Sequence, residues 1–190
     1  MNDTWQWLED SALEIAPRLL NCRLVRTIDG HQLSGRIVEV EAYDQTDAAS
    51  HSYKGRTPRT DVMFGPAGHL YVYFTYGMHY CCNIVVGRPG EGAAVLIRAL
   101  EPLTGLPQMQ VNRHGRPESE LTNGPAKVCQ ALAIDRSMNG HELTQAPLLL
   151  EQQPALTPSA IVQTTRIGIS REQDKPWRFY VRGNAFISKP

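Results

Sequence analysis

The stretch from residue 69 to residue 86, HLYVYFTYGMHYCCNIVV, limits the fold more than any other part of this chain. It is apolar and aromatic on both sides of Tyr76-Gly77, and this pair is typical of a tight turn because glycine adopts positive φ without strain. We therefore predict two antiparallel strands joined by a hairpin. A hairpin alone is marginally stable in water, so it requires a larger sheet with a buried face.

Other segments supply the rest of such a sheet. Strands are predicted in residues 22–43 and 92–102. Residues 160–169 and 178–187 are each predicted to be a late strand or a strand followed by a loop. Residues 22–43 are divided by an Asp29-Gly30 turn into a second hairpin. Pro102 is expected to end the segment that begins at residue 92, because proline cannot donate to the hydrogen-bond ladder.

Two segments have the pattern of helices. Residues 11–21 form one, in which Pro17 restricts the hydrogen-bonded part. Residues 122–135 form the clearer one, with Asn123 as its cap and Pro125 in its first turn. Residues 44–68 and 103–120 are expected to be loops, and residues 139–159 show no second core. The sequence thus predicts an α+β fold in a single domain, 1–190, with a curved, mostly antiparallel sheet flanked by helices.

The charge of the chain argues against a strongly basic nucleic-acid binder, because 19 Lys and Arg balance 19 Asp and Glu. The charges are nevertheless unevenly distributed. Residues 1–50 hold four basic and nine acidic residues, whereas the segment KGRTPR, 54–59, holds three basic residues and no acid. Such a local positive face can contact phosphates. On charge alone, a solvated loop is the better interpretation.

Cysteine spacing and hydropathy exclude several other classes. The four cysteines form no C-x-x-C motif, and there is no H-E-x-x-H motif, so we expect buried free thiols and no metal. No stretch of ~18 apolar residues predicts a membrane span. The first twenty residues lack the basic start of a signal peptide, so we expect a cytoplasmic protein.

The segment VEVEAY, residues 38–43, raises a question about two carboxylates. Strand alternation predicts that Val38 and Val40 face the core. The other face would then carry Ile37, Glu39, Glu41 and Tyr43. A carboxylate beside an aromatic ring could act as a general base on water. Two glutamates on a solvated face are the simpler interpretation, and a Glu39–Glu41 dyad in a small-molecule hydrolase is a third.

Three polar or aromatic residues farther along the chain also allow two interpretations each. Tyr76 is either an ordinary hairpin tyrosine or a ring that stacks on bases. Asn83, within an apolar strand, is either a satisfied structural amide or a group that points into a pocket. Arg98 lies in a similar strand and needs an anion, which could be Glu41 or a phosphate. Tyr71 and Tyr73 are most simply core or sheet-face residues.

Seven segments in order resemble one known family. They are RIVEVEAYD, ASHSYKGRTPRT, LYVYFTYGMHYCCNIV, AVLIRALEP, NGPAKVCQALAID, TRIGIS and RFYVRGNAFIS. Together they resemble the alkyladenine (3-methyladenine, methylpurine) DNA glycosylases, from about residue 13 to the C-terminus. The resemblance implies a monofunctional enzyme that flips damaged purines out of duplex DNA and hydrolyses their glycosidic bond without a metal or cofactor. Its substrates would be of the 3-methyladenine, hypoxanthine or ethenoadenine type.

The resemblance also implies roles for individual residues. Glu41 matches the general base, and Tyr76 matches the side chain that fills the gap left in the duplex. The remaining matches are Tyr43, His51, Asn83 and Arg98 for the base-binding pocket, and Arg56, Thr57, Arg59 and Met78 for contact with DNA. The expected partner is duplex DNA containing damaged purines, bound by a monomer. A non-catalytic nucleic-acid-binding module of the same fold is the alternative, but Glu41, Tyr43 and Asn83 are all retained.

Overall fold

The computed structural model describes residues 3–190; residues 1 and 2, the start of the stretch that we interpret as lacking a signal peptide, lie outside the described part. The strands are β1 (Arg23–Ile28), β2 (His31–Tyr43), β3 (Leu70–Thr75), β4 (His79–Val86), β5 (Ala93–Thr104), β6 (Leu148–Glu151), β7 (Ile161–Thr164) and β8 (Arg178–Val181). The α-helices are α1 (Ala12–Leu19), α2 (Leu106–Asn112) and α3 (Pro125–Ala131). Short 3-10 helices lie at Asp3–Leu8, Asp61–Phe64, Glu118–Glu120, Arg136–Met138 and Pro158–Ala160.

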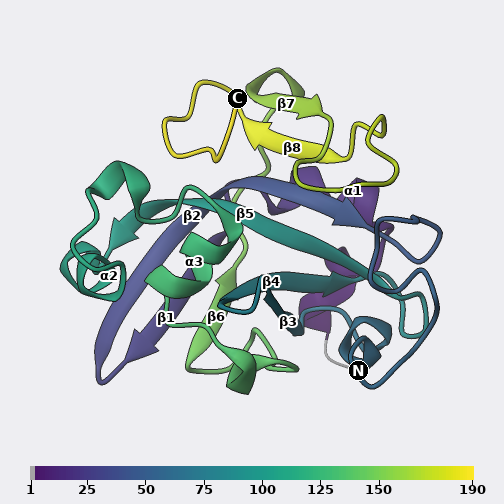
Figure 1. Cartoon of the computed structure of the whole chain (residues 1–190), viewed down its shortest axis with the longest axis horizontal. Helices are drawn as coiled ribbons and strands as arrows, with labels where there is room; N and C mark the ends of the chain where they lie inside the picture. The colour runs from purple at the N-terminus through teal and green to yellow at the C-terminus, as the bar shows by residue number, and fades with distance from the viewer. Residues whose placement is uncertain (1–2) are drawn as a thin grey trace.

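The strands form one antiparallel sheet that curls around the molecule (Figure 1). Its main order is β3-β4-β5-β2-β1-β6, and β8 joins it through β2 and carries β7. The long strand β2 makes this branching possible, because Arg36 pairs with β1 whereas Glu39 and Glu41 pair with β8. The predicted α+β fold with a curved antiparallel sheet is thus confirmed.

A β-bulge in β2 changes the face on which one predicted residue lies. The pairing of β2 with β5 shifts register between Ile37 and Glu39 and again between Glu39 and Val40. An extra residue in one strand interrupts the alternation of side chains and increases the local twist. Ile37 therefore joins the main core together with Val40, and the prediction that it shares a face with Glu39 and Glu41 is wrong.

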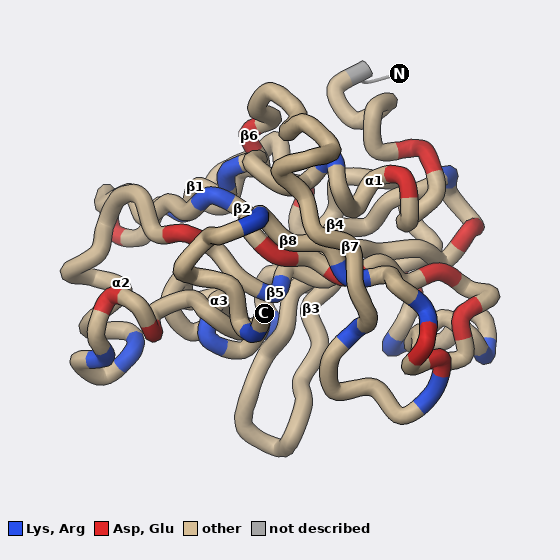
Figure 2. The backbone as a smooth tube through the Cα atoms, turned by 90° about the horizontal axis from the view of Figure 1, so that it is seen from above, with Lys and Arg blue, Asp and Glu red and all other residues tan. Residues whose placement is uncertain are grey.

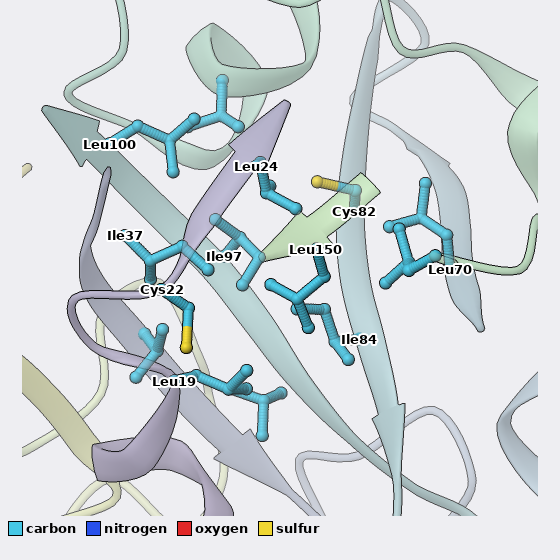
Figure 3. Packing of buried hydrophobic residues seen from close by; sticks show 14 of the residues in the cluster. Leu19, Cys22, Leu24, Ile37, Leu70, Cys82, Ile84, Ile97, Leu100 and Leu150 are labelled. Carbon is cyan, nitrogen blue, oxygen red and sulfur yellow. The ribbon is translucent and has the colours of Figure 1, made fainter. Parts of the chain in front are cut away.

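The two faces of the sheet carry different kinds of side chains. One face is covered by α1 and buries the main apolar core, which includes Leu19, Cys22, Leu24, Ile37, Leu70, Cys82, Ile84, Ile97, Leu100 and Leu150 (Figure 3). The opposite face of the same strands carries the polar and aromatic residues, among them Tyr71 on β3, Asn83 on β4 and Arg98 on β5. Because neighbours along a strand point to opposite faces, core packing on one side determines what the other side presents.

Both predicted helices form, with differences at their ends. Ser11 caps α1 in a reciprocal capping box with Glu14, which satisfies backbone groups at the helix start. α3 begins at Pro125 as expected, but Gly124 is its N-cap. The Asn123 side chain instead accepts a hydrogen bond from Lys127 Nζ at 2.7 Å, so the prediction that Asn123 caps the helix is wrong.

Several predicted boundaries are also wrong. β5 continues past Pro102 to Thr104, because Pro102 lies opposite Gly35, where the pairing with β2 already shifts register. The predicted loop 103–120 contains α2. Residues 139–159, for which no element was predicted, contribute β6 to the same sheet. The two late segments each form a four-residue strand, β7 and β8, followed by a loop, which agrees with the strand-plus-loop alternative. Along residues 3–190, no helix is long and apolar enough to cross a membrane.

Candidate active site

A cavity of about 520 Å³ opens on the sheet face opposite the main core. Its size falls in the ~300–1,000 Å³ range typical of small-molecule pockets. The sheet supplies its floor and walls, including Glu41, Tyr43, Tyr71, Tyr73, Cys81, Asn83, Leu96 and Arg98. Loops supply the rest, chiefly residues 48–51 and 167–171 and the tip of the β3–β4 hairpin.

Glu41 is a fully buried carboxylate at this cavity. Its Oε1 accepts a hydrogen bond from the backbone N–H of Ile167 at 2.7 Å and lies 3.2 Å from Arg98 Nη1. Its Oε2 accepts one from the Tyr43 hydroxyl at 2.8 Å. A carboxylate oxygen can accept two hydrogen bonds, and the described residues fill only one of these positions on Oε2. Oε2 therefore keeps acceptor capacity for a water molecule.

Glu39 is buried to the same extent but lies outside the cavity lining. Its oxygens accept hydrogen bonds from Arg98, Arg178 and Ser188. The interpretation of Glu39 and Glu41 as a solvated strand face is therefore wrong, because residues far along the chain cover both of them. The Glu39–Glu41 dyad is also not formed, since only Glu41 reaches the cavity.

The buried charge of Arg98 is balanced by two carboxylates. The structure pairs it with both carboxylates, through Nε to Glu39 at 3.1 Å and through Nη1 to Glu41 at 3.2 Å. Burial alone would lower the pKa of Arg98, but the negative charges of Glu41 and Glu39 outweigh it and raise that pKa. Arg98 thus stays charged and supports the position of Glu41.

Tyr43 is held by a second buried ion pair. The Arg166 guanidinium lies 4.6 Å from the centre of the Tyr43 ring and pairs with the fully buried Asp47. Arg166 also donates to the Ala42 carbonyl oxygen at 3.0 Å. Burial and the carboxylate of Glu41 raise the pKa of Tyr43 well above its usual range. Its hydroxyl therefore remains a proton donor to Glu41.

His51 forms another wall of the cavity, with its ring 4.5 Å from that of Tyr73 in an edge-to-face arrangement. Its Nε2 accepts from Arg59 at 3.3 Å, so the proton lies on Nδ1, which donates to the Tyr71 hydroxyl at 3.0 Å. Although His51 is exposed at the rim, desolvation of the ring and the charge of Arg59 lower its pKa to about 4. The ring is therefore neutral at pH 7.

Asn83 reaches the cavity from β4 and is 5% exposed. Its amide nitrogen donates to the Tyr71 carbonyl oxygen at 3.1 Å, which orients the side chain. Its oxygen accepts no hydrogen bond from residues 3–190 and remains available to a ligand. Both interpretations from the sequence therefore apply, because the amide is anchored and also lines a pocket.

Cys81 lies next to Asn83 along the cavity wall, and burial raises the pKa of its thiol to about 11. All four cysteines are buried and free, as predicted. Within residues 3–190, no group of three or more His, Cys, Asp or Glu side chains is arranged to hold a metal ion.

The tip of the β3–β4 hairpin is the most exposed apolar feature near the cavity. Tyr76 is 83% exposed and Met78 is 70% exposed. Tyr76 and Gly77 both have positive φ, at 52° and 68°, which is unusual for a tyrosine. Figure 2 shows that the hairpin carries no Lys, Arg, Asp or Glu. Tyr76 lines the cavity together with residues 167–171.

The predicted phosphate-contacting residues lie on the exposed loop before β3. The Arg59 guanidinium lies beside His51, which lines the cavity. Arg56, on the same loop, is exposed and pairs with Asp61 at 2.5 Å. Thr57 exchanges hydrogen bonds with Thr60 and so stabilises the turn between them. All three side chains are exposed, and Arg59 brings a positive charge to His51, whereas the charge of Arg56 is paired with Asp61.

Comparison with known proteins agrees with this arrangement. The methylpurine-DNA glycosylase family model matches residues 6–185. The chain belongs to the methylpurine-DNA glycosylase family. It is a DNA glycosylase, a hydrolase that cleaves N-glycosidic bonds. This conclusion disfavours the alternative of a non-catalytic nucleic-acid-binding module.

Curated relatives are similar along nearly their whole length, and each is named "Putative 3-methyladenine DNA glycosylase". The protein of Carboxydothermus hydrogenoformans is 52% identical over 185 residues, which cover 97% of each chain. That of Methanoculleus marisnigri is 48% identical over 184 residues, or 95% of each chain. That of Francisella tularensis subsp. tularensis is 46% identical over 192 residues, which cover each chain fully.

The structure adds residues to the site of this glycosylase that the sequence analysis did not assign. Tyr71 and Tyr73 line the cavity, Arg166 holds Tyr43, and the Ile167 backbone N–H binds Glu41. The segment TRIGIS, 165–170, was part of the family resemblance and was the signal for the last two. The sequence alone does not show that Arg166 lies against Tyr43, or that the Ile167 N–H reaches Glu41 on β2.

Proposed function

We propose that this glycosylase flips an alkylated or deaminated purine nucleotide out of duplex DNA into the cavity and hydrolyses its glycosidic bond, with Glu41 as the general base. The substrates are of the 3-methyladenine, hypoxanthine or ethenoadenine type. The names of the relatives support the first of these. The enzyme acts as a monomer.

One observation carries this proposal. Glu41 is buried at the cavity, and its Oε2 retains an acceptor position while Tyr43, Ile167 and Arg98 hold the rest of the carboxylate. A water molecule at Oε2 would be oriented and polarised by a charge that is already fixed. Such preorganised charge requires no rearrangement during the reaction.

The chemistry follows from this geometry. The water oxygen forms a bond to C1′ of the sugar, one water proton passes to Glu41, and the bond from C1′ to the purine nitrogen breaks. The purine takes the electron pair of that bond, so a cationic alkylated purine leaves as a neutral molecule. Positive charge develops on the sugar in the transition state, and the carboxylate of Glu41 also stabilises it.

The other residues bind the flipped nucleotide and the DNA around it. Tyr43 and His51 sandwich the base, and the neutral state of His51 suits stacking on a cationic purine. Asn83 disfavours guanine by crowding its exocyclic amino group. Tyr76 fills the gap in the duplex and offsets the few kcal/mol that base flipping costs. The backbone contacts come from Arg56, Thr57, Arg59 and Met78.

Excision from defined duplexes tests this proposal. Duplexes that each carry one lesion are incubated with the enzyme and then treated with alkali, which cleaves at abasic sites. Wild-type protein should produce cleavage at the lesion, and Glu41→Gln should reduce the rate by about 10²–10⁴-fold, because it removes the proton acceptor. Binding of the lesion duplex should remain. An active Glu41→Gln variant would contradict the mechanism.

A further inference from the structure

Glu39 is a buried charge for which the proposed chemistry has no direct use. It is fully buried and lies outside the cavity. Its Oε1 accepts hydrogen bonds from Arg98 Nε at 3.1 Å, Arg178 Nη1 at 3.0 Å and Ser188 Oγ at 2.9 Å, and its Oε2 accepts one from Ser188 N at 2.5 Å. A carboxylate with four donors in a dry site is rigidly placed.

Arg98 is held by Glu39 and its neighbours from three directions. Its Nε contacts Glu39, its Nη1 contacts Glu41 at 3.2 Å, and its Nη2 donates to Ser188 Oγ at 3.2 Å. A planar guanidinium with a partner for each nitrogen has little freedom to rotate. Glu41 consequently receives a single Arg98 nitrogen, on Oε1.

The segment that follows β8 closes this network. Ser188 contacts Glu39 through both its backbone and its hydroxyl, and the Lys189 carbonyl accepts from Arg178 Nη1 at 2.7 Å. These contacts come from the end of the chain, whereas Glu39 lies on β2. The C-terminal segment therefore covers Glu39 and keeps it away from water.

We propose that Glu39, held by Ser188, is a positioning residue that keeps Arg98 from pairing with both oxygens of Glu41. This inference rests on the proposed role of Glu41 as general base. Arginine pairs preferentially with a carboxylate through two parallel hydrogen bonds. Without Glu39, the guanidinium of Arg98 would be free to turn and occupy the acceptor position on Oε2. The attacking water would then lose its base.

Charge balance leads to the same expectation. Glu39 and Glu41 together offset Arg98 and Arg178 within this network. The other charged or titratable groups close to Glu41 are Tyr43, Tyr73 and Arg166. Neutralising Glu39 leaves an excess of positive charge around Glu41, which makes that carboxylate a weaker proton acceptor. The acid limb of the pH–rate profile should therefore move to lower pH as the maximal rate falls.

Single-turnover kinetics test the role of Glu39. The probe is a duplex treated with dimethyl sulfate, with enzyme in excess, and released 3-methyladenine is measured by chromatography across pH. Glu39→Gln should lower the maximal rate by about 10–100-fold, the size expected for a displaced catalytic group. Binding of the duplex should change less than about threefold, because Glu39 lies outside the cavity.

Two further variants make the experiment specific. Ser188→Ala keeps every charge and removes one contact to Glu39 and one to Arg98, so it should lower the rate by a smaller factor, without the pH shift. Glu101→Gln is the matched control, since Glu101 also pairs with an arginine between β2 and β5, through Arg36, but lies outside the cavity. It should leave the rate within about twofold.

The outcomes separate the two proposals. Wild-type protein that releases no base would overturn the proposed function and this inference with it. Release by wild type, with an unchanged rate and pH profile in Glu39→Gln, would overturn the positioning role alone. Equal losses of binding and rate with no pH shift would also overturn it, because they indicate general damage. If Glu39→Gln does not fold, a wild-type rate in Ser188→Ala overturns the role and a reduced rate supports it.

Discussion

At the scale of single residues, Glu39 and Glu41 show how two identical side chains on one strand receive different environments. Both point to the same side of β2 and both are fully buried. Glu41 meets Tyr43 and the Ile167 backbone at the cavity, whereas Glu39 meets Arg178 and Ser188 beneath it. The two carboxylates do not differ in exposure but in the hydrogen-bond donors around them. Glu41 Oε2 accepts one hydrogen bond and can still accept one from water.

His51 supplies a prediction at this scale. Its pKa of about 4 in the folded protein lies below the ~6.5 of an unperturbed histidine. Between these values the unfolded chain binds more protons than the folded one, so stability falls as the pH drops from 6.5 towards 4. His51→Gln should remove this part of the pH dependence. Urea unfolding at pH 7, 5.5 and 4.5 measures it, and equal slopes for both proteins would contradict the prediction.

At the scale of elements, the β3–β4 hairpin combines local strain with exposure. Tyr76 has positive φ and is 83% exposed, so it neither relaxes its backbone nor buries its ring. A non-glycine residue in this region costs on the order of 1–3 kcal/mol. Such a position is more easily explained by contact with a ligand than by stability of the free protein.

Tyr76→Asn tests this explanation, because asparagine tolerates positive φ better than tyrosine does. The variant should melt at the wild-type temperature or above it, since few contacts are lost. Its affinity for a lesion duplex should fall by about tenfold, the size of one lost stacking interaction of ~1–3 kcal/mol. Fluorescence anisotropy and thermal melting measure the two effects.

Leu13→Gln provides the comparison for this variant, since Leu13 is 38% exposed on α1, which lies against the other face of the sheet. Its affinity for the lesion duplex should match that of wild type. If Tyr76→Asn also binds as wild type does, the hairpin has no part in DNA binding.

At the scale of the whole molecule, net charge conceals a local asymmetry. The chain is neutral, yet the exposed loop that carries Arg56 and Arg59 brings the Arg59 guanidinium to His51, a residue of the cavity lining. The β3–β4 hairpin carries no charged residue (Figure 2). Local charge of this kind can attract a polyanion without making the protein basic. Because only a few basic residues lie on the loop of Arg56 and Arg59, the protein is expected to neutralise only a few DNA phosphates.

The salt dependence of DNA binding measures how many phosphates the protein neutralises. Affinity for duplex DNA should fall as salt concentration rises, because phosphate contacts release counterions. The double variant Arg56→Gln and Arg59→Gln should reduce the slope of log affinity against log salt by about two contacts. Arg23→Gln, an exposed arginine on β1 that lies outside the cavity lining, is the control and should keep the wild-type slope. A slope unaffected by the double variant would exclude these contacts.

The fold could be predicted where local chemistry decides it. The apolar runs around Tyr76-Gly77 and Asp29-Gly30 indicated both hairpins, and Ser11 and Pro125 lie where their helices begin. The errors occur where long-range pairing decides. The bulge next to Ile37 and the continuation of β5 past Pro102 depend on how two strands align, and neither strand encodes that alone.

The features of the candidate site also fall into those that the sequence gives and those that depend on the tertiary structure. The sequence by itself determined the residue types and, through alternation on β3, β4 and β5, which side of the sheet carries Tyr71, Asn83 and Arg98. Only the tertiary structure decided that Glu39 and Glu41 are buried and which of them faces the cavity. The reason is physical, because a carboxylate is buried only where donors surround it, and here those donors come from β5, from the loop before β8 and from the end of the chain.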